Sequence, residues 1–425
     1  MKVILKAGGA IMADPEQFRS YLENIISFNK HGPVIAVVSA FKGVTDLLLY
    51  GWQGKDFREL GLEFLELYGN DALFLSNQEF YHRELRNMDY HCQVLRQYPN
   101  DLKALDTLIT AGERFSVKVL DYHLRLRGIK SQVVFPGSIG FRGDNNYQNG
   151  KIDLDCVSEV KDKLSQLFVQ GIIPILPGYY VDSSDGLPLT LGRGASDQIA
   201  AFLGYALGAQ VYLLKETHAV LSMCPSDNAA TVDCLSYNMA REVGKIIQRR
   251  ALQWVEKGNL ELIIANNLNP NIQTLINSEG PQDTGVKVIR IQEGNFVEIF
   301  DIPDEPAMLY GLLSNFKDCN IVGAGDTPNS VCLFIEQGDI ILPIEKIRST
   351  YPVKSFPGHF IKLVGNLNFS LKREIAEFTE QEIGFEPVGY FGNMRNAVTY
   401  SIGLPYDESI RDKLVVKLHR RFIEQ

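Results

Sequence analysis

The residues best suited to chemistry in this sequence are a lysine and two glycines at the end of its first apolar run. Lys6 supplies a positive charge, while Gly8 and Gly9 allow a tight turn that brings backbone N–H groups close to an anion. Such a loop suits a polyphosphate, although a plain turn explains a strand followed by Gly-Gly equally well. The phosphate interpretation therefore depends on other residues converging on the loop.

The stretch TLGRGASDQ, residues 190–198, is more informative. Arg193 lies between two glycines and is able to hold a carboxylate through two hydrogen bonds, and the helix expected to follow adds N–H donors for negative charge. Asp197 is placed to orient Lys6 or a metal-bound phosphate. The alternative is that Ser196 or Asp197 only caps the helix. Gly-Arg-Gly favours a functional role, because a cap alone does not need it.

Two other stretches place polar groups beside expected strands and helices. Ser39 and Thr45 offer hydroxyls after the second apolar run, where a simple turn is the alternative. Glu113 begins an apolar helical pattern, and a carboxylate there either caps the helix or receives an ammonium group of a ligand. His218 and Cys224 are poor candidates for a metal ligand or a nucleophile, because no partner accompanies them in the sequence. We expect no metal site in the protein itself.

The amino-acid composition and net charge indicate the class of protein and the kind of ligand that it binds. The chain has 425 residues, 45% of them hydrophobic and 22% charged, which is typical of a globular protein of roughly two or three domains. A net charge of -9 argues against nucleic acid and anionic membranes as partners and favours a small molecule. The six cysteines are scattered, so reduced thiols and a cytoplasmic location are expected. No apolar run approaches the roughly 20 residues of a membrane helix, and the start does not resemble a signal peptide.

The order of apolar runs predicts an α/β fold. Short β-branched runs alternate with helical patterns, and several are apolar throughout, as in strands covered on both faces. Residues 52–130 are expected to be mostly helical. The polar, turn-rich PQDTG at 281–285 marks a boundary, after which two similar units of short strands and helices follow each other.

The four motifs together resemble the aspartate kinase branch of the amino-acid kinase family. That branch carries Lys-Phe-Gly-Gly-Thr-Ser, Val-Ser-Ala-Met-x-Gly-Val-Thr, Ser-x-Gly-Glu and Thr-Leu-Gly-Arg-Gly-Gly-Ser-Asp, where this chain reads KAGGAI, VSAFKGVT, TAGE and TLGRGASD. The resemblance implies a three-layer αβα sandwich, the amino-acid kinase fold, over residues 1–285. It also implies tandem ACT domains over 286–425, approximately 286–350 with the C-terminal tail and 357–410.

The resemblance further implies transfer of the ATP γ-phosphate to the β-carboxylate of L-aspartate, with Mg²⁺ bound through the nucleotide phosphates. Lys6 and Asp197 would be catalytic. Ser39, Thr45, Glu113, Arg193 and Ser196 would bind the amino acid, Glu113 taking its ammonium and Arg193 a carboxylate. The nucleotide would contact Lys6, Gly8, Gly9, Lys215 and Glu216.

The nucleotide side departs from the family pattern. Residues 215–219 read KETHA where the family has Thr-Asp-Val-Asp-Gly, and Ala10 and Ile11 replace Thr-Ser in the first loop. Positions matching the amino-acid pocket survive, so some ligand is still expected to bind. The alternatives are a kinase for another nucleotide or carboxylate, and a catalytically silent amino-acid-binding regulator.

Tandem ACT domains imply control by an amino-acid effector and a homodimer. Asp304 or Glu305 would meet the ammonium group of an effector such as lysine or threonine. Both acids are equally well explained as residues at the start of a helix.

Overall fold

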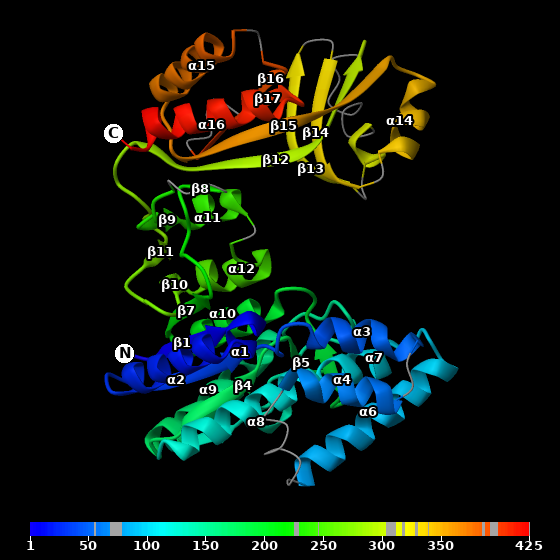
Figure 1. The fold of residues 1–425 in the computed structure, drawn as a ribbon, viewed down its shortest axis with the longest axis vertical. Coiled ribbons are helices and arrows are strands. Elements are labelled where there is room, and N and C mark those ends of the chain that lie inside the picture. Colours follow the sequence, from blue (N-terminus) through cyan, green and yellow to red (C-terminus); the bar gives the residue numbers. More distant parts are fainter. Residues whose placement is uncertain are drawn as a thin grey trace. The chain divides into compact units, whose positions relative to one another are not determined.

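The protein is described here by a computed structural model (Figure 1). The structure describes residues 1–54, 57–68, 79–224, 229–244, 246–302, 312–316, 319–327, 330–338, 340–384, 387–391 and 398–424. The chain forms two compact units. Unit 1 comprises residues 1–220 and 244–278, and unit 2 comprises residues 221–243 and 279–425. This division follows contacts alone, so the catalytic and regulatory ranges expected from the sequence stay predictions.

A largely parallel sheet forms the centre of unit 1. Its strands run in the order β3 (Ser131–Val133), β4 (Ile173–Pro177), β2 (Val34–Val38), β1 (Val3–Ala7), β7 (Gln210–Lys215), β10 (Leu262–Asn266) and β11 (Gln273–Asn277). Among these strands only the last pair, β10 and β11, is antiparallel. All five residues of β1, β2 and β4 are buried, which confirms the prediction of strands covered on both faces.

Helices cover both faces of this sheet. Against one face pack α2 (Pro15–Asn29) and α8 (Ala111–Leu126), whose apolar side chains share a core with Val3, Leu5 and Ala7 of β1. Since side chains alternate along a strand, Lys6 points to the opposite face, where β1 contacts α10 (Ala195–Leu207). Next to α10 lie α9 (Val157–Val169) and α12 (Arg249–Lys257). The alternation of side chains along β1 therefore directs Lys6 toward α10.

The helical region predicted for residues 52–130 is present. The helices α3 (Val44–Gly54), α4 (Phe57–Tyr68), α6 (Glu79–Gln97) and α7 (Leu102–Ile109) lie together at one end of unit 1 (Figure 1). The remaining elements of unit 1 are the short helix α1 (Gly9–Ala13), two 3₁₀ turns (Pro136–Ile139 and Leu154–Cys156) and a hairpin of β5 (Tyr180–Asp182) and β6 (Pro188–Thr190).

Unit 2 is built on an antiparallel sheet with two long strands at its centre. The strands β12 (Gly285–Phe300) and β15 (Val353–Asn366) pair from Gly285 opposite Asn366 to Ile299 opposite Val353. Beyond β12 lie β14 (Ser330–Gln337) and β13 (Asn320–Thr327), and beyond β15 lie β17 (Thr399–Pro405) and β16 (Gly389–Phe391). The two repeated units predicted from sequence are therefore joined into one sheet.

Each half of this sheet has its own helices and core. Helix α14 (Ile341–Arg348) packs over the β13–β14 half, whereas α15 (Phe369–Ile383) and α16 (Glu408–Phe422) lie side by side over the other (Figure 1). Residues 221–243 add β8 (Met223–Cys224), β9 (Cys234–Ser236) and α11 (Tyr237–Val243) to unit 2. Strand β8 pairs with β12, and Ser222 Oγ lies 2.8 Å from His419 Nε2 of α16.

Candidate active site

The candidate site lies where neighbouring parallel strands of unit 1 end. Strands β2, β1 and β7 are adjacent and parallel, so Ser39, Lys6 and Lys215 are brought to one edge of the sheet. Loops at the carboxyl ends of parallel strands are the usual place for a ligand. The loop before α10 reaches the same edge, because α10 packs against β1, β2 and β7.

Lys6 and Asp197 form a buried ion pair. Lys6 Nζ lies 2.7 Å from Asp197 Oδ1, and the two residues are 8% and 7% exposed. Burial by itself raises the pKa of the Asp197 carboxyl, but the positive charges of Lys6 and Lys215 outweigh this effect and hold that pKa below its ordinary value. Asp197 is therefore ionised and fixes the position of the lysine ammonium. This contact brings together the two residues that the resemblance marks as catalytic.

Lys215 is the second cation at this edge. Burial holds the pKa of Lys215 below its ordinary value; the negative charge of Asp197 opposes this shift only in part, and the positive charge of Lys6 adds to it. Two lysines thus share one carboxylate, which leaves positive charge available to an anion. Glu216, by contrast, is exposed, and its backbone oxygen accepts a hydrogen bond from Gln17 Nε2 at 3.2 Å.

The glycine loop is shaped by close backbone contact. A Cβ atom on Gly9 would lie 2.6 Å from the Ala40 carbonyl oxygen, and Lys42 N donates to Gly9 O at 3.0 Å. At Gly8 the nearest atom to such a Cβ would be Lys6 Nζ, 3.8 Å away. Gly9 is therefore required by packing, whereas Gly8 leaves room beside the lysine ammonium.

Ser39 and Ser196 join the second strand to the α10 loop. Ser39 Oγ donates to Ser196 Oγ at 2.9 Å, and a Cβ atom on Gly178 would lie 2.4 Å from Ser196 Oγ. The side chain of Ser196 caps no backbone group of α10, so the cap alternative for this residue does not hold. Thr45 is half-buried near the start of α3.

Glu113 is a buried carboxylate with one unpaired oxygen. It is 2% exposed; Oε1 accepts from Ala40 N at 3.2 Å, and Oε2 has no hydrogen-bond partner in the described part of the chain. Burial raises the pKa of this carboxyl to about 8, and the Ala40 N–H only partly opposes the shift. A ligand ammonium at Oε2 would restore the charged form.

Arg193 is exposed between two glycines with left-handed backbone angles, Gly192 at φ 85° and Gly194 at φ 74°. Only glycine adopts such angles without strain, so Gly-Arg-Gly serves to turn the loop out toward solvent. Arg193 lies close enough to Tyr179 to oppose the rise in its pKa, which burial causes and Glu113 reinforces.

Tyr179 and Asp106 contact the residues just before the Arg193 loop, and sequence reasoning missed both. Tyr179 adopts a left-handed φ of 74°, which is unfavourable for a residue with a Cβ, and its backbone oxygen accepts from Leu191 N at 3.0 Å. Asp106 is fully buried and accepts from Thr190 N at 2.7 Å and from Gln148 N at 3.2 Å. Neither belongs to a recognisable motif, and the only signal for Asp106 was an acid within an apolar helix.

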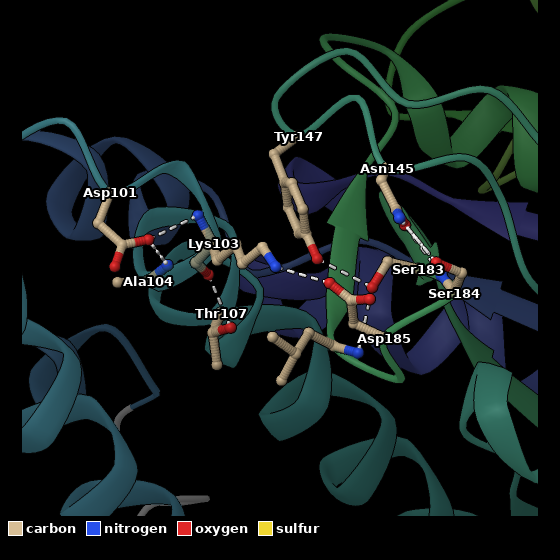
Figure 2. Close-up of polar contacts among 10 residues, drawn as sticks. Asp101, Lys103, Ala104, Thr107, Asn145, Tyr147, Ser183, Ser184 and Asp185 are labelled. Carbon is tan, nitrogen blue, oxygen red and sulfur yellow. Dashed lines mark hydrogen bonds and ion pairs between the residues drawn. The ribbon is translucent and has the colours of Figure 1, made fainter.

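A second, more exposed polar network joins α7, the segment around Tyr147 and the turn between β5 and β6 (Figure 2). Lys103 at the start of α7 forms an ion pair of 2.6 Å with Asp185 in the β5–β6 turn. In the same network Tyr147 donates to Ser183 Oγ at 2.9 Å, and Asn145 Nδ2 to Ser184 Oγ at 2.7 Å. Asp106 is thus the buried anchor of a larger set of contacts between α7 and the two loops.

The other candidates are an exposed histidine and two acids outside the described residues. His218 is exposed, and no cluster of metal-binding side chains occurs in the described part of the chain. Asp304 and Glu305 fall within residues 303–311, outside the described part of the chain. Within the described ranges, no helix is both long and apolar enough to cross a membrane.

A largely parallel sheet with helices on both faces, and with two lysines and a glycine loop at its strand ends, defines an α/β protein with positive charge at that edge. The chain belongs to the amino acid kinase family, whose model matches residues 1–266. It is 24% identical over 291 residues to aspartokinase 1 of Arabidopsis thaliana, covering 63% of this chain and 50% of that protein. To the aspartokinase of Mycobacterium bovis it is 24% identical over 335 residues, covering 75% and 68%. The chain therefore spans about half the length of the first of these relatives.

Solved structures share the fold over nearly the whole chain. E. coli aspartokinase III in complex with lysine and aspartate superposes with a TM-score of 0.81 at 17% identity, covering 99% of both chains. The aspartate kinase of Clostridium acetobutylicum also gives 0.81 at 17% identity, covering 99% of this chain and 100% of the other. The predicted fold class, an amino-acid kinase fold followed by ACT domains, is confirmed.

Proposed function

We propose that this protein is an aspartate kinase, which transfers the γ-phosphoryl group of ATP to the β-carboxylate of L-aspartate. The observation that carries the proposal is the buried Lys6–Asp197 pair beside the open loop at Gly8. Catalysis of phosphoryl transfer is mainly positioning and charge neutralisation, and a fixed lysine at a glycine loop supplies both. Family membership and the aspartokinase relatives point to the same reaction.

Lys6 and Lys215 would hold the nucleotide phosphates. Lys215 stands where the related kinases carry an uncharged threonine, so this chain brings a second positive charge to that edge. That charge would compensate for the two hydroxyls that the first loop lacks at Ala10 and Ile11. Mg²⁺ would be bound through the triphosphate and would neutralise its oxygens. Asp197 would hold Lys6 rather than bind the metal, because its carboxylate is already paired with the lysine.

The acceptor amino acid would lie between Glu113 and Arg193. The unpartnered Oε2 of Glu113 suits the ammonium group, and the exposed guanidinium of Arg193 suits the α-carboxylate through two hydrogen bonds. Ser39 and Thr45 would supply hydroxyls, with Ser196 supporting the loop. The free β-carboxylate is then directed at the γ-phosphate, whose developing charge faces Lys6.

Regulation is proposed for unit 2. The E. coli neighbour was solved with lysine and aspartate, and the Clostridium neighbour is described as an allosteric enzyme. We expect this chain to bind an amino-acid effector at its ACT domains through Asp304 or Glu305 and to form a homodimer. A cytoplasmic location also stays a prediction.

A panel of acceptors tests the reaction and its alternatives. Purified protein with Mg·ATP is assayed for ADP release with L-aspartate, L-glutamate, N-acetyl-L-aspartate or no acceptor. We expect release with L-aspartate and none with N-acetyl-L-aspartate, because Glu113 requires a free ammonium group. L-glutamate has this group but is one methylene longer, so we expect its side-chain carboxylate to miss the γ-phosphate. Release with another carboxylate, or with another nucleoside triphosphate only, would identify a variant kinase. Absence of release with every pair, despite aspartate binding in calorimetry, would identify a silent regulator.

A further inference from the structure

A cavity in unit 1 lies beside α10 and α12, and none of the residues assigned above lines it. Its volume is about 310 Å³. We call it the α10–α12 pocket, and it is lined by Lys151, Ile152, Gln198, Arg250, Gln253, Trp254 and Lys257. Ligand sites in proteins usually have volumes of about 300–1,000 Å³, so a small metabolite fits here.

The lining is strongly cationic. It contains Lys151, Arg250 and Lys257 and no acidic residue. The guanidinium of Arg250 is held only by neutral acceptors, Gly150 O at 3.1 Å, Leu191 O at 3.4 Å and Asn149 Oδ1 at 2.6 Å. Lys257 Nζ lies 5.4 Å from the Trp254 ring centroid. No carboxylate pairs with these three cations in the part of the chain that the structure describes. Their combined charge is therefore available to an anion.

Gln198 supplies an independent sign of a ligand. This residue is 2% exposed, and its Oε1 atom is buried without a hydrogen-bond partner among the described residues. A buried amide oxygen without a donor is unfavourable, and such groups in folded proteins call for an explanation. A ligand with a hydroxyl or N–H group in the pocket would satisfy it.

We propose that the α10–α12 pocket binds a small oxyanion with at least two negative charges and one hydrogen-bond donor. A hydroxyl-bearing phosphate ester and a hydroxy-polycarboxylate share this chemistry. The negative charges would meet Lys151, Arg250 and Lys257, and the donor would meet Gln198 Oε1.

The pocket is connected to the Arg193 loop. Arg250 donates to Leu191 O, two residues before Arg193, and a Cβ atom on Gly194 would lie 3.0 Å from Gln248 Cγ, just before α12. An anion that draws the Arg250 guanidinium away from Leu191 would loosen this support. If the proposed function is correct, occupancy of the pocket raises the KM for the amino acid; the binding itself does not rest on that function.

Calorimetry on the full-length protein at fixed ionic strength tests the proposal. Glycerol 2-phosphate and citrate are titrated separately into the wild type, the double variant K151Q/K257Q, the charge-matched double variant K161Q/K163Q on α9, and K6A. The four lysines of the two double variants, Lys151, Lys257, Lys161 and Lys163, are exposed, so both variants should keep the fold. An unchanged thermal unfolding temperature verifies this.

We expect saturable binding of at least one probe to the wild type, unchanged in K161Q/K163Q and K6A. In K151Q/K257Q the affinity should fall about tenfold or more, because charge-assisted hydrogen bonds are lost. Which probe binds distinguishes a phosphate ester from a polycarboxylate. The proposal is overturned if neither probe binds, if K151Q/K257Q binds as well as the wild type, or if K6A abolishes binding, since the anion would then occupy the candidate active site.

Discussion

At the scale of single residues, the site depends on how burial changes charge. Lys6 and Lys215 hold the Asp197 carboxylate in its ionised form, whereas Glu113 lies in a place where burial dominates and its pKa rises to about 8. The two carboxylates are thus set to opposite states by their surroundings. Asp197 is charged and pairs with Lys6, whereas Glu113 is mostly neutral and its proposed role is to receive an ammonium group.

Glu113 predicts a proton release on substrate binding. Without ligand its carboxyl is mostly protonated at pH 7, because its pKa of about 8 lies above that pH. The ammonium group of L-aspartate lowers this pKa, so binding at pH 7 should release about one proton per chain. At about pH 9.5 the group is already ionised, and the release should vanish.

Calorimetry of aspartate binding in buffers of different ionisation enthalpy measures this release. E113Q is the control, in which binding is weaker and the measured enthalpy does not depend on the buffer. A wild-type enthalpy that is the same in every buffer at pH 7 would show that Glu113 does not receive the ammonium group.

At the scale of elements, the helix α7 holds two segments in place, the β5–β6 hairpin and the loop around Gln148. Asp106 in that helix accepts hydrogen bonds from Thr190 N at the end of β6 and from Gln148 N. The ion pair between Lys103 and Asp185 also joins α7 to the β5–β6 hairpin (Figure 2). Both of its side chains are about half exposed. Buried and exposed contacts between the same elements should therefore differ strongly in their energetic weight.

Substitution of Asp106 tests this difference. D106N keeps the shape but replaces one acceptor oxygen with a donor, which leaves buried donors unsatisfied and should lower the free energy of unfolding by about 1–3 kcal/mol. D185N breaks the exposed ion pair and should cost about 0–1 kcal/mol. Denaturant unfolding measures both. Equal losses in the two variants would contradict the assignment of Asp106 as the anchor.

The sequence predicted much of this arrangement, and the exceptions have physical reasons. The sequence predicted that Asp197 orients Lys6, and these two side chains are in contact in the structure. It also placed Ser39 directly after the second apolar run, which is strand β2. Tyr179 was not predicted, because its left-handed φ arises from tertiary contacts rather than from local sequence. Asp106 was missed for a similar reason, since its partners lie 42 and 84 residues away. The positive charge of the α10–α12 pocket likewise depends on cations from two separate segments, Lys151 in one and Arg250 and Lys257 in the other.

At the scale of the whole molecule, the chain leaves unit 1 and returns to it. Residues 221–243 belong to unit 2, where Met223 pairs opposite Ile289 of β12 and Glu242 forms an ion pair with Lys362 of β15. This segment follows β7, the strand that carries Lys215, and it precedes α12. A change in unit 2 therefore has a covalent route to β7, which carries Lys215, and to α12.

A truncated chain tests this assignment. A fragment of residues 1–278 retains 221–243 but lacks β12, β15 and α16. The segment therefore loses the pairing of β8 with β12, the contact of Ser222 with His419 and the ion pair of Glu242 with Lys362. Limited proteolysis should cut the fragment within 221–243 at least about tenfold faster than the full chain, because local opening becomes easier. Cleavage elsewhere in 1–220 should be similar in both. Equal protection of 221–243 would mean that the segment is stabilised by unit 1 instead.

The most direct test of the central claim is the capture of aspartyl phosphate. Purified protein is incubated with Mg·ATP, L-aspartate and hydroxylamine, and the aspartyl hydroxamate is measured for the wild type, K6A and K30A. Lys30 is an exposed residue after α2 and serves as the control for charge removal. The account predicts aspartate-dependent hydroxamate in the wild type and K30A, and a loss of about a hundredfold or more in K6A, because Lys6 neutralises the transferred phosphoryl group. Hydroxamate formation by K6A at the wild-type rate, or none by the wild type, would contradict it.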